Sequence, residues 1–263
     1  MGGLIFVGLG LAGLQDITLR GLDAVRSADI VVAEFYTSHL IGVDVSELEA
    51  LVGKPIRVLG REDVESHAEK LLQDARTRLV AFLVAGDAMS ATTHHDLRSR
   101  AMDLGIPTRY IPGVSIFTTA PAAAGLQIYK FGRTTTIPFP EGRYQPESFY
   151  DAIRENKQRG LHTLVLLDIQ ADKSRYMTIQ QAVESLRAVE ERRKEHVVEA
   201  DTMIVGLARV GSRDERVVVA PADAWKSIDL GPPLHCLVVP GTLHFQEEAA
   251  LGKLRDGAPS RSV

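Results

Sequence analysis

The stretch Leu4-Ile5-Phe6-Val7, followed at once by Gly8-Leu9-Gly10-Leu11-Ala12-Gly13, decides the fold of this chain. A run of large apolar residues bounded by glycine predicts a short strand that is buried on both faces. Strands of that kind belong to parallel or mixed sheets covered by helices on both sides, so we expect an α/β protein. The glycines that follow let the backbone turn tightly and pass close to a ligand.

The glycine loop matches the G-x-G-x-x-G pattern literally, and Glu34 ends the next predicted strand about twenty residues later, as in dinucleotide-binding proteins. A dinucleotide-dependent oxidoreductase is therefore one interpretation. Helix placement argues against it, because the best N-cap is Asp16, and the predicted helix Ile17–Ser27 then begins after the glycines. A carboxylate at that point would repel a pyrophosphate. A simple tight turn is the remaining alternative.

Apolar runs and amphipathic stretches alternate along the rest of the chain, which extends the α/β pattern. Strands are predicted at Leu4–Val7, Ile30–Ala33, Ile56–Leu59, Leu79–Ala85, Leu164–Leu167, Thr202–Ala208, Val217–Ala220 and Leu234–Val239. Helices are predicted at Ile17–Ser27, Ser66–Thr77, Thr93–Leu104, Phe117–Gly125, Glu147–Arg159, Thr178–Glu195 and Pro221–Ser227. The Pro-Gly-containing segment Arg109–Val114 is expected to be a linker between two α/β lobes, residues 1–112 and 113–263. Ligands of such proteins bind between lobes, at the carboxyl ends of strands.

Composition narrows the class of protein. The chain has 263 residues, of which 45% are hydrophobic and 24% charged, and a net charge of -4, which disfavours binding along a polyphosphate backbone. The one cysteine, Cys236, lies in an apolar run and is expected to be a core residue, so no disulfide can form within the chain and we expect a cytoplasmic protein. No apolar run reaches the roughly 18 residues of a membrane span, and no secretory signal is expected.

Two further segments carry candidate chemistry. Gly86-Asp87 follows a buried strand, where a sheet presents groups that bind ligands, and Pro112-Gly113-Val114-Ser115-Ile116 opens an apolar helix. Asp87 could complement a cation, and the Ser115 amide could meet a ligand carboxylate. The structural alternatives are that Asp87 or Thr92 caps the next helix and that Ser115 caps its own.

Three other segments are conspicuous for their charge, their irregularity or their histidines. The charge run Glu190–Glu195 is expected to be a solvated helix face. The irregular loop Ile137–Pro146 is expected at the surface, either facing a protein substrate or simply stiff. Adjacent His94 and His95 point to different sides of a helix, and no His-x-x-x-His or Cys-x-x-Cys pair exists, so no metal site is expected.

The glycine loop, the Gly-Asp turn and the Pro-Gly-Val-Ser turn, in this order, resemble the tetrapyrrole-methylase-like superfamily of methyltransferases. More specific stretches resemble the diphthine synthases within it, and they run from the first strand to about residue 245. These stretches are Asp16-Ile17-Thr18, Ala33-Glu34-Phe35-Tyr36-Thr37-Ser38, Arg61-Glu62-Asp63-Val64-Glu65, Ala91-Thr92-Thr93-His94, Gly125-Leu126-Gln127-Ile128-Tyr129-Lys130-Phe131-Gly132, Gly160-Leu161-His162-Thr163-Leu164 and Val239-Pro240-Gly241. One departure is Ala88, which stands where the superfamily usually has proline after Gly-Asp.

The resemblance implies a two-lobed homodimer that binds S-adenosylmethionine between its lobes and releases S-adenosylhomocysteine. Its substrate would be the aminocarboxypropyl-histidine of elongation factor 2, whose amino group would be trimethylated to give diphthine. Matching positions imply cofactor contacts, several through the backbone, at Leu11, Asp87, Ser90, Ser115, Ile116, Leu167, Val210 and His235. Leu167 and His235 could instead be ordinary core residues. No catalytic residue is assigned. A tetrapyrrole (precorrin-type) methyltransferase and a non-catalytic binding module of the same fold remain as alternatives.

Overall fold

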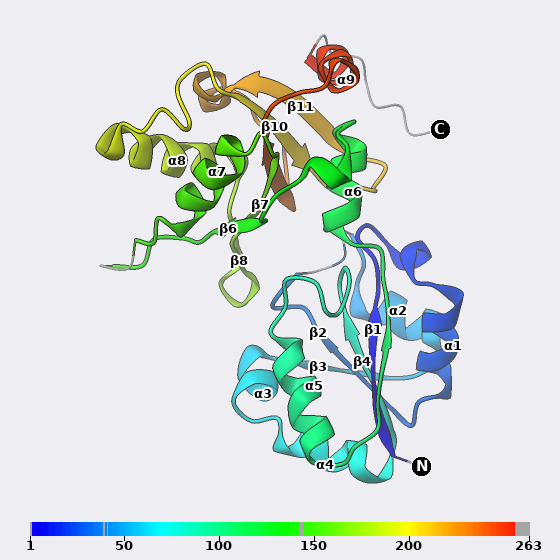
Figure 1. Ribbon diagram of the computed structural model, residues 1–263. Helices are drawn as coiled ribbons and strands as arrows, with labels where there is room; N and C mark the ends of the chain where they lie inside the picture. The colour runs from blue at the N-terminus through cyan, green and yellow to red at the C-terminus, as the bar shows by residue number, and fades with distance from the viewer. Residues whose placement is uncertain (1, 39, 41, 143–144, 256–263) are drawn as a thin grey trace. The chain divides into compact units, whose positions relative to one another are not determined.

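The computed structural model describes residues 2–38, 40, 42–142 and 145–255 of an α/β chain (Figure 1). The chain divides into two compact units. The first comprises Met1–Ile116 with Gln170–Ser174, and the second comprises Phe117–Ile169 with Arg175–Val263. Each unit is built around its own five-stranded sheet, so the predicted α/β class is confirmed.

The first sheet is entirely parallel, with the strand order β3-β2-β4-β1-β5. The strands are β1 (Gly3–Gly8), β2 (Ile30–Glu34), β3 (Ile56–Leu59), β4 (Leu79–Val84) and β5 (Thr108–Ile111). The interpretation of Arg109–Val114 as a linker is wrong for its first half, because Leu4 to Val7 of β1 pair in register with Thr108 to Ile111. Irregular structure begins only at Pro112, which has no N–H to donate to a sheet.

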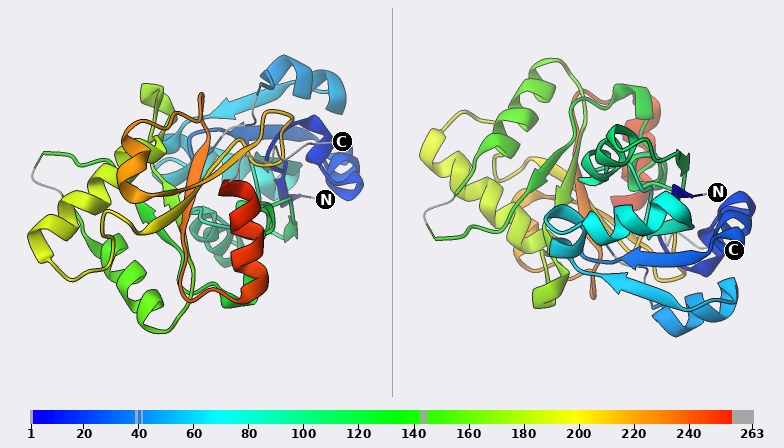
Figure 2. Two further views of the ribbon diagram at one scale, coloured as in Figure 1. Left: turned by 90° about the horizontal axis from the view of Figure 1, so that it is seen from above. Right: turned by 90° about the horizontal axis from the view of Figure 1, so that it is seen from below.

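Helices cover both faces of this sheet, as its apolar strands require (Figure 2). Leu4 and Phe6 of β1 point into one core cluster, whereas Ile5 and Val7 point into the other, because successive side chains alternate across a strand. Helices α1 (Leu19–Ser27) and α2 (Val45–Val52) pack on the second cluster. Helices α3 (Arg61–Glu65), α4 (Glu69–Thr77) and α5 (His94–Asp103) pack on the first.

The start of α1 differs from the prediction. The N-cap is Thr18, whose hydroxyl accepts a hydrogen bond from the Gly21 N–H at 3.0 Å, and Asp16 lies outside the helix in a 3₁₀ turn, Leu14–Asp16. Helices α2 and α3 were not predicted. Both are short, so neither has enough turns for apolar periodicity to be recognised.

The second sheet is mixed, with the order β11-β10-β12-β7-β6, and only its β6–β7 pair is parallel. The strands are β6 (Thr135–Ile137), β7 (Thr163–Leu167), β10 (Met203–Ala208), β11 (Arg216–Pro221) and β12 (His235–Val239). A two-stranded ribbon, β8 (Ile169–Gln170) and β9 (Arg175–Tyr176), flanks the 3₁₀ turn Ala171–Lys173. Cys236 of β12 is buried as expected, and burial raises the pKa of its thiol to about 12.

The helices of the second unit are α6 (Ile116–Ala123, whose first residue belongs to the first unit), α7 (Ser148–Gln158), α8 (Ile179–Arg193) and α9 (Phe245–Arg255). The predicted helix Pro221–Ser227 is instead a 3₁₀ helix, Ala222–Lys226, and a second 3₁₀ turn spans Ile128–Lys130. The core of this unit joins α7 and α8 to the sheet and includes Trp225, which is fully buried.

The prediction of a surface loop at Ile137–Pro146 is wrong for its first residues and confirmed for Pro140–Gly142, which are exposed. Ile137 and Phe139, expected in a surface loop, are core residues, because Ile137 pairs with Leu167 and the Phe139 N–H donates to Asp168 at 2.8 Å. Arg143 and Tyr144 of that predicted loop lie outside the described residues.

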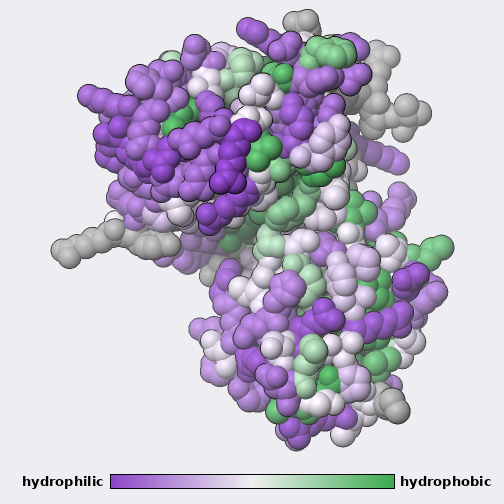
Figure 3. Space-filling view, in the orientation of Figure 1, coloured by the Kyte–Doolittle hydropathy of each residue, from purple (hydrophilic) through white to green (hydrophobic). Residues whose placement is uncertain are grey.

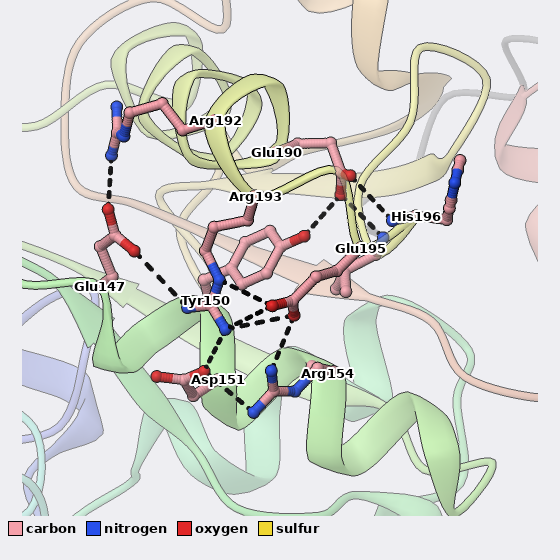
Figure 4. A network of polar contacts seen from close by, with 10 residues as sticks. Glu147, Tyr150, Asp151, Arg154, Glu190, Arg192, Arg193, Glu195 and His196 are labelled. Carbon is pink, nitrogen blue, oxygen red and sulfur yellow. Dashed lines mark hydrogen bonds and ion pairs between the residues drawn. The ribbon is translucent and has the colours of Figure 1, made fainter.

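The charge run at the end of α8 is only partly solvated. Glu190 is buried and accepts hydrogen bonds from the Tyr150 hydroxyl at 2.7 Å and from the N–H groups of His196, Val197 and Val198 (Figure 4). Arg193 reaches back to Asp151 of α7 at 2.7 Å, so the run fastens α8 to α7. The outer surface around these two helices is hydrophilic (Figure 3).

Candidate functional site

Three glycine-containing turns meet at the carboxyl edge of the first sheet. Gly8 ends β1, and Gly86 and Gly113 follow β4 and β5. A Cβ atom on Gly113 would lie 2.3 Å from the Gly86 carbonyl oxygen, and one on Gly8 would lie 2.6 Å from the Gly113 nitrogen. Because both obstacles are backbone atoms, no side chain fits at either position. Gly10 and Gly86 also exchange backbone hydrogen bonds of 3.1 and 2.7 Å, so the turns form one continuous backbone surface.

Asp16 closes the glycine loop from within. Its Oδ2 atom accepts hydrogen bonds from the N–H groups of Leu11 at 3.0 Å and Ala12 at 2.8 Å. In a phosphate-binding loop such N–H groups point at the ligand, whereas here they are occupied by the protein's own carboxylate. The loop is therefore unsuited to a pyrophosphate. The prediction that Asp16 caps the first helix is wrong, but its carboxylate does lie in the glycine loop, where it would repel a pyrophosphate.

Two other parts of the dinucleotide pattern are also missing. A Cβ on Gly13 would meet nothing within 4 Å, so the third glycine of the motif does not serve close packing of a helix on a strand. Glu34 is completely buried and bonds the Tyr36 and Thr37 N–H groups, both at 3.1 Å, and the Thr37 hydroxyl. It is thus unavailable to a ribose.

Asp87 links the turn after β4 to the turn after β5. Oδ1 accepts from the Met89 N–H and the Ser90 hydroxyl, both at 3.0 Å, and Oδ2 accepts from the Gly113 N–H at 3.1 Å and from the Tyr110 hydroxyl. Burial, together with this hydrogen bond, raises the pKa of Tyr110 to about 12. Neither Asp87 nor Thr92 caps α5, whose N-cap is Thr93. Asp87 thus holds the shape of the two turns.

The predicted site residues of the first unit surround this junction. Leu11 lies beside Gly86, Ser90 bonds Asp87, and Ser115 and Ile116 stand two and three residues after Gly113. Ala88 is fully buried, and its carbonyl accepts from the Thr92 hydroxyl at 2.9 Å, so the turn is held without the proline that the superfamily usually has there.

The predicted residues of the second unit gather at one end of its sheet. His235 pairs with Ala208, and its neighbour Cys236 pairs with Leu166, next to Leu167. Val210 follows Ala208 by two residues and is buried. Leu167 lies at the end of β7 and is buried in the core cluster of the second unit, as expected of an ordinary core residue.

His235 has an unused acceptor. Its Nε2 lies 3.1 Å from the Pro232 carbonyl oxygen and must donate to it, which leaves Nδ1 without a proton. Nδ1 is buried and has no partner among the described residues. Burial also lowers the pKa of His235, which favours this neutral form. A ligand N–H or O–H would satisfy this atom, so His235 differs from a core histidine whose two nitrogens are both satisfied.

Sequence reasoning missed Arg209. Its backbone adopts the left-handed region, with φ at 49°, and its guanidinium donates to the carbonyl oxygens of Leu230 at 2.9 Å, Asp214 at 3.2 Å and Pro232. The Arg209 N–H also bonds the Leu234 carbonyl at 2.8 Å. Arg209 therefore shapes the loop that presents Val210 and His235. Its position before a predicted site residue was the only signal in the sequence.

Among the described residues, no three His, Cys, Asp or Glu side chains cluster as they would around a metal ion. Within the same residues, no helix has the length and apolar character needed to cross a membrane.

Comparison with known proteins gives consistent results. Residues 3–225 match the family model of tetrapyrrole (corrin/porphyrin) methylases. The chain is 48% identical over 253 residues to the diphthine synthase of Methanosphaera stadtmanae, covering 96% of each chain. It is 49% identical to that of Methanocella arvoryzae, covering 95% of this chain and 97% of the relative. A crystal structure of diphthine synthase has a TM-score of 0.87, at 38% identity and 96% coverage of both chains.

Proposed function

The chain belongs to the tetrapyrrole methylase family and, within it, to the diphthine synthases, and on that premise we propose that it methylates a modified histidine of elongation factor 2. It is a methyltransferase of diphthamide biosynthesis that depends on S-adenosylmethionine. The acceptor would be the amino group of the aminocarboxypropyl-histidine, and three successive transfers would give diphthine.

The observation that carries the cofactor assignment is the glycine junction closed by Asp16. A ligand can approach the backbone of this junction closely, because no side chains cover the glycines. The N–H groups of Leu11 and Ala12 are occupied by Asp16 and cannot bind an anion, so the junction suits a cationic sulfonium better than a pyrophosphate. Leu11, Asp87, Ser90, Ser115 and Ile116 would form one part of the cofactor site. Leu167, Val210 and His235 would form the other, with Nδ1 of His235 accepting a hydrogen bond from the cofactor.

The lobe expected at residues 1–112 would supply Leu11, Asp87 and Ser90, and the lobe expected at residues 113–263 would supply the other five contacts. The active protein would be a cytoplasmic homodimer whose macromolecular substrate is elongation factor 2. The relatives named as diphthine synthases support these assignments.

Orientation would supply most of the rate enhancement. S-adenosylmethionine, when bound, supplies a methyl group on a positively charged sulfur. The acceptor amine must be unprotonated; with a reference pKa near 8, about a tenth is free at pH 7, a cost of roughly 1.4 kcal/mol. Alignment of the two reactants can contribute roughly 7–11 kcal/mol. The residues of this chain therefore need to bind and orient, and a dedicated base is unnecessary.

The test has two stages. The purified protein is incubated with S-adenosylmethionine, S-adenosylhomocysteine and NAD, and native mass spectrometry identifies the bound ligand. Binding of NAD alone would contradict the cofactor assignment. Elongation factor 2 carrying the aminocarboxypropyl-histidine is then treated with enzyme and S-adenosylmethionine, and a gain of three methyl groups on that residue is expected.

The second stage separates the alternatives. No gain on the histidine, with methylation of a precorrin-type tetrapyrrole, would keep the family and reject the substrate. A fourth methyl group, as a carboxyl ester, would mean that the reaction does not stop at diphthine. Tight cofactor binding without any turnover would indicate a binding module.

A further inference from the structure

Two buried ionisable side chains, Glu34 and His94, face each other beside the turn after β4. Glu34 ends β2, His94 begins α5, and both are completely buried. His94 Nε2 lies 3.3 Å from Glu34 Oε1. The imidazole also makes edge-on contact with the Phe82 ring, at 5.0 Å between centroids. Neither residue is among the predicted cofactor contacts.

The other nitrogen of His94 determines its protonation. Nδ1 lies 3.1 Å from the Ala88 carbonyl oxygen. A carbonyl oxygen can only accept, so Nδ1 must carry a proton and donate it. A neutral His94 then has a bare Nε2, which faces Glu34.

A bare Nε2 facing a carboxylate would bring two lone pairs together in a buried environment. Among the described residues, Glu34 included, none makes a hydrogen bond with Nε2 as the ring and the carboxylate are placed. The contact is favourable only if one proton lies between the two atoms, either on the carboxyl or on the ring.

Burial decides which partner holds this proton. It raises the pKa of Glu34 to about 7, although hydrogen bonds from Thr37 and Tyr36 and the charge of Arg61 lower it. Burial also lowers the pKa of His94, more than the Ala88 carbonyl and Glu65 raise it, and His95 lowers it further. Arg61, which lowers the pKa of Glu34, and Glu65, which raises that of His94, pair with each other at 3.2 Å, which limits the net field of α3. The raised pKa of Glu34 and the lowered pKa of His94 both favour the uncharged side chains, with the shared proton on Glu34.

We propose that Glu34 and His94 share one proton, and that this protonated pair is a positioning device that fixes the turn after β4 in its cofactor-binding shape. The pair connects two segments. Glu34 holds the N–H groups of Tyr36 and Thr37, and His94 holds the carbonyl of Ala88, the residue after Asp87. The functional half of this proposal rests on the proposed cofactor site.

Loss of the proton would release the turn. A carboxylate at Glu34 attracts a proton onto Nε2, and the neutral ring then carries none on Nδ1. Nδ1 would present a lone pair to the Ala88 carbonyl, and that hydrogen bond would break. The expected consequence is a tautomer change of His94 and weaker cofactor binding as pH rises through the pKa of Glu34.

Nitrogen-15 NMR of histidine-labelled protein tests the pair without reference to function. The His94 signals, identified by their absence in His94→Asn, should report a neutral ring with the proton on Nδ1 at about pH 6, changing towards Nε2–H at about pH 8.5. Glu34→Gln should keep the Nδ1–H form throughout, because its amide N–H donates to Nε2 at every pH. A His94 ring with its proton on Nε2 at the lower pH would overturn the proposal.

Calorimetry with S-adenosylhomocysteine tests the positioning role. Wild-type affinity should fall roughly fivefold more than that of Glu34→Gln over this pH range, the equivalent of one hydrogen bond. The ligand's own amino group titrates equally in both measurements, so the ratio isolates the pair. His67→Asn, at an exposed histidine between α3 and α4, should follow the wild type. Identical pH profiles for wild type and Glu34→Gln would reject the positioning role, whereas no binding by any variant at any pH would instead reject the proposed cofactor.

Discussion

Nε2 of His162 lies 3.1 Å from Oε1 of Glu247, although 85 positions separate the two residues in the chain, and both side chains are buried. The Gly241 N–H donates to Nδ1 of the same ring at 2.9 Å, so the ring proton is on Nε2 and is donated to Glu247. Glu247 also accepts from Lys130 and from the N–H groups of Gln127 and His244. This one carboxylate fastens the start of α9 to the segment before β6 and to the start of β7.

Replacing Glu247 with glutamine should destabilise the fold strongly. The amide would aim an N–H at groups that are themselves donors, and breaking a buried pair of this kind costs about 3–5 kcal/mol. Urea unfolding followed by circular dichroism measures the loss. Glu248→Gln, at the exposed neighbour, is the matched control and should change stability by less than about 0.5 kcal/mol. Equal effects of the two substitutions would contradict the assignment.

Stability should fall in acid because of Glu190 and Glu247. Burial alone would raise their pKa values, but hydrogen bonds outweigh it and lower each pKa to about 2. Since each folded pKa lies below the ordinary 4.5, the stabilisation is complete above pH 4.5 and disappears as pH falls towards 2, up to about 3 kcal/mol per group. Unfolding free energies measured from pH 7 downward should show a shallower acid slope for Glu190→Gln than for the exposed control Glu191→Gln. Parallel slopes would exclude Glu190 as a source.

Glu34 should act in the opposite direction. Its folded pKa, about 7, lies above the ordinary value, so its contribution is complete below pH 4.5 and is lost as pH rises through 7. Glu34→Gln should therefore have a flatter stability profile between those values than the wild type. Chemical unfolding of both proteins at several pH values measures the profile. The same profile for Glu34→Gln and the wild type would mean that another group titrates in this range.

Alanine substitutions should separate the glycines of the site. Gly113→Ala puts a Cβ 2.3 Å from the Gly86 carbonyl oxygen, and the resulting backbone shift should cost roughly 1–3 kcal/mol and weaken S-adenosylhomocysteine binding at least tenfold. Gly13→Ala, with open space around its Cβ, should leave the unfolding free energy nearly unchanged. Calorimetry measures the S-adenosylhomocysteine affinity of both variants, and urea unfolding measures their unfolding free energies. A destabilised Gly13→Ala with an unaffected Gly113→Ala would refute the packing of the three turns.

Asp87→Ala should weaken cofactor binding by deforming the site. It removes the acceptor of the Gly113 N–H and the Tyr110 hydroxyl, and unsatisfied buried donors cost about 1–3 kcal/mol each. S-adenosylhomocysteine affinity is measured beside that of Asp103→Ala, an exposed control at the end of α5. Unchanged affinity in a folded Asp87→Ala would separate the Asp87 turn from the cofactor site.

His235→Ala addresses a direct contact. Because Nδ1 has no partner within the part of the chain that the structure describes, removing the ring should affect ligand binding more than folding. We expect a loss of roughly tenfold in S-adenosylhomocysteine affinity, about 1.4 kcal/mol, with less than that lost in unfolding free energy. Calorimetry beside chemical unfolding measures both quantities, and a loss confined to stability would return His235 to a structural role.

Local patterns in the sequence determined the class of fold. Val7 and its apolar neighbours form a strand that is buried on both faces. The other predicted strands, which begin at residues 30, 56, 79, 164, 202, 217 and 234, correspond to observed strands within one or two residues. The order of short motifs also identified the family. Strands and turns can be predicted in this way because they depend on residues that are neighbours in the chain. The alternation of side chains along a strand determines which face is buried, and the backbone preferences of glycine determine where a turn forms.

Only the tertiary structure decided the partners of the buried polar groups. Asp16 was expected to cap a helix and instead closes the glycine loop, Glu190 was expected in solvent and is buried, and Glu34 meets His94 across the sheet edge. A carboxylate can accept from any donor that folding brings near, and burial makes the choice energetically decisive. Spacing along the chain cannot specify which distant donor that is, because the choice is made where separate strands and helices meet.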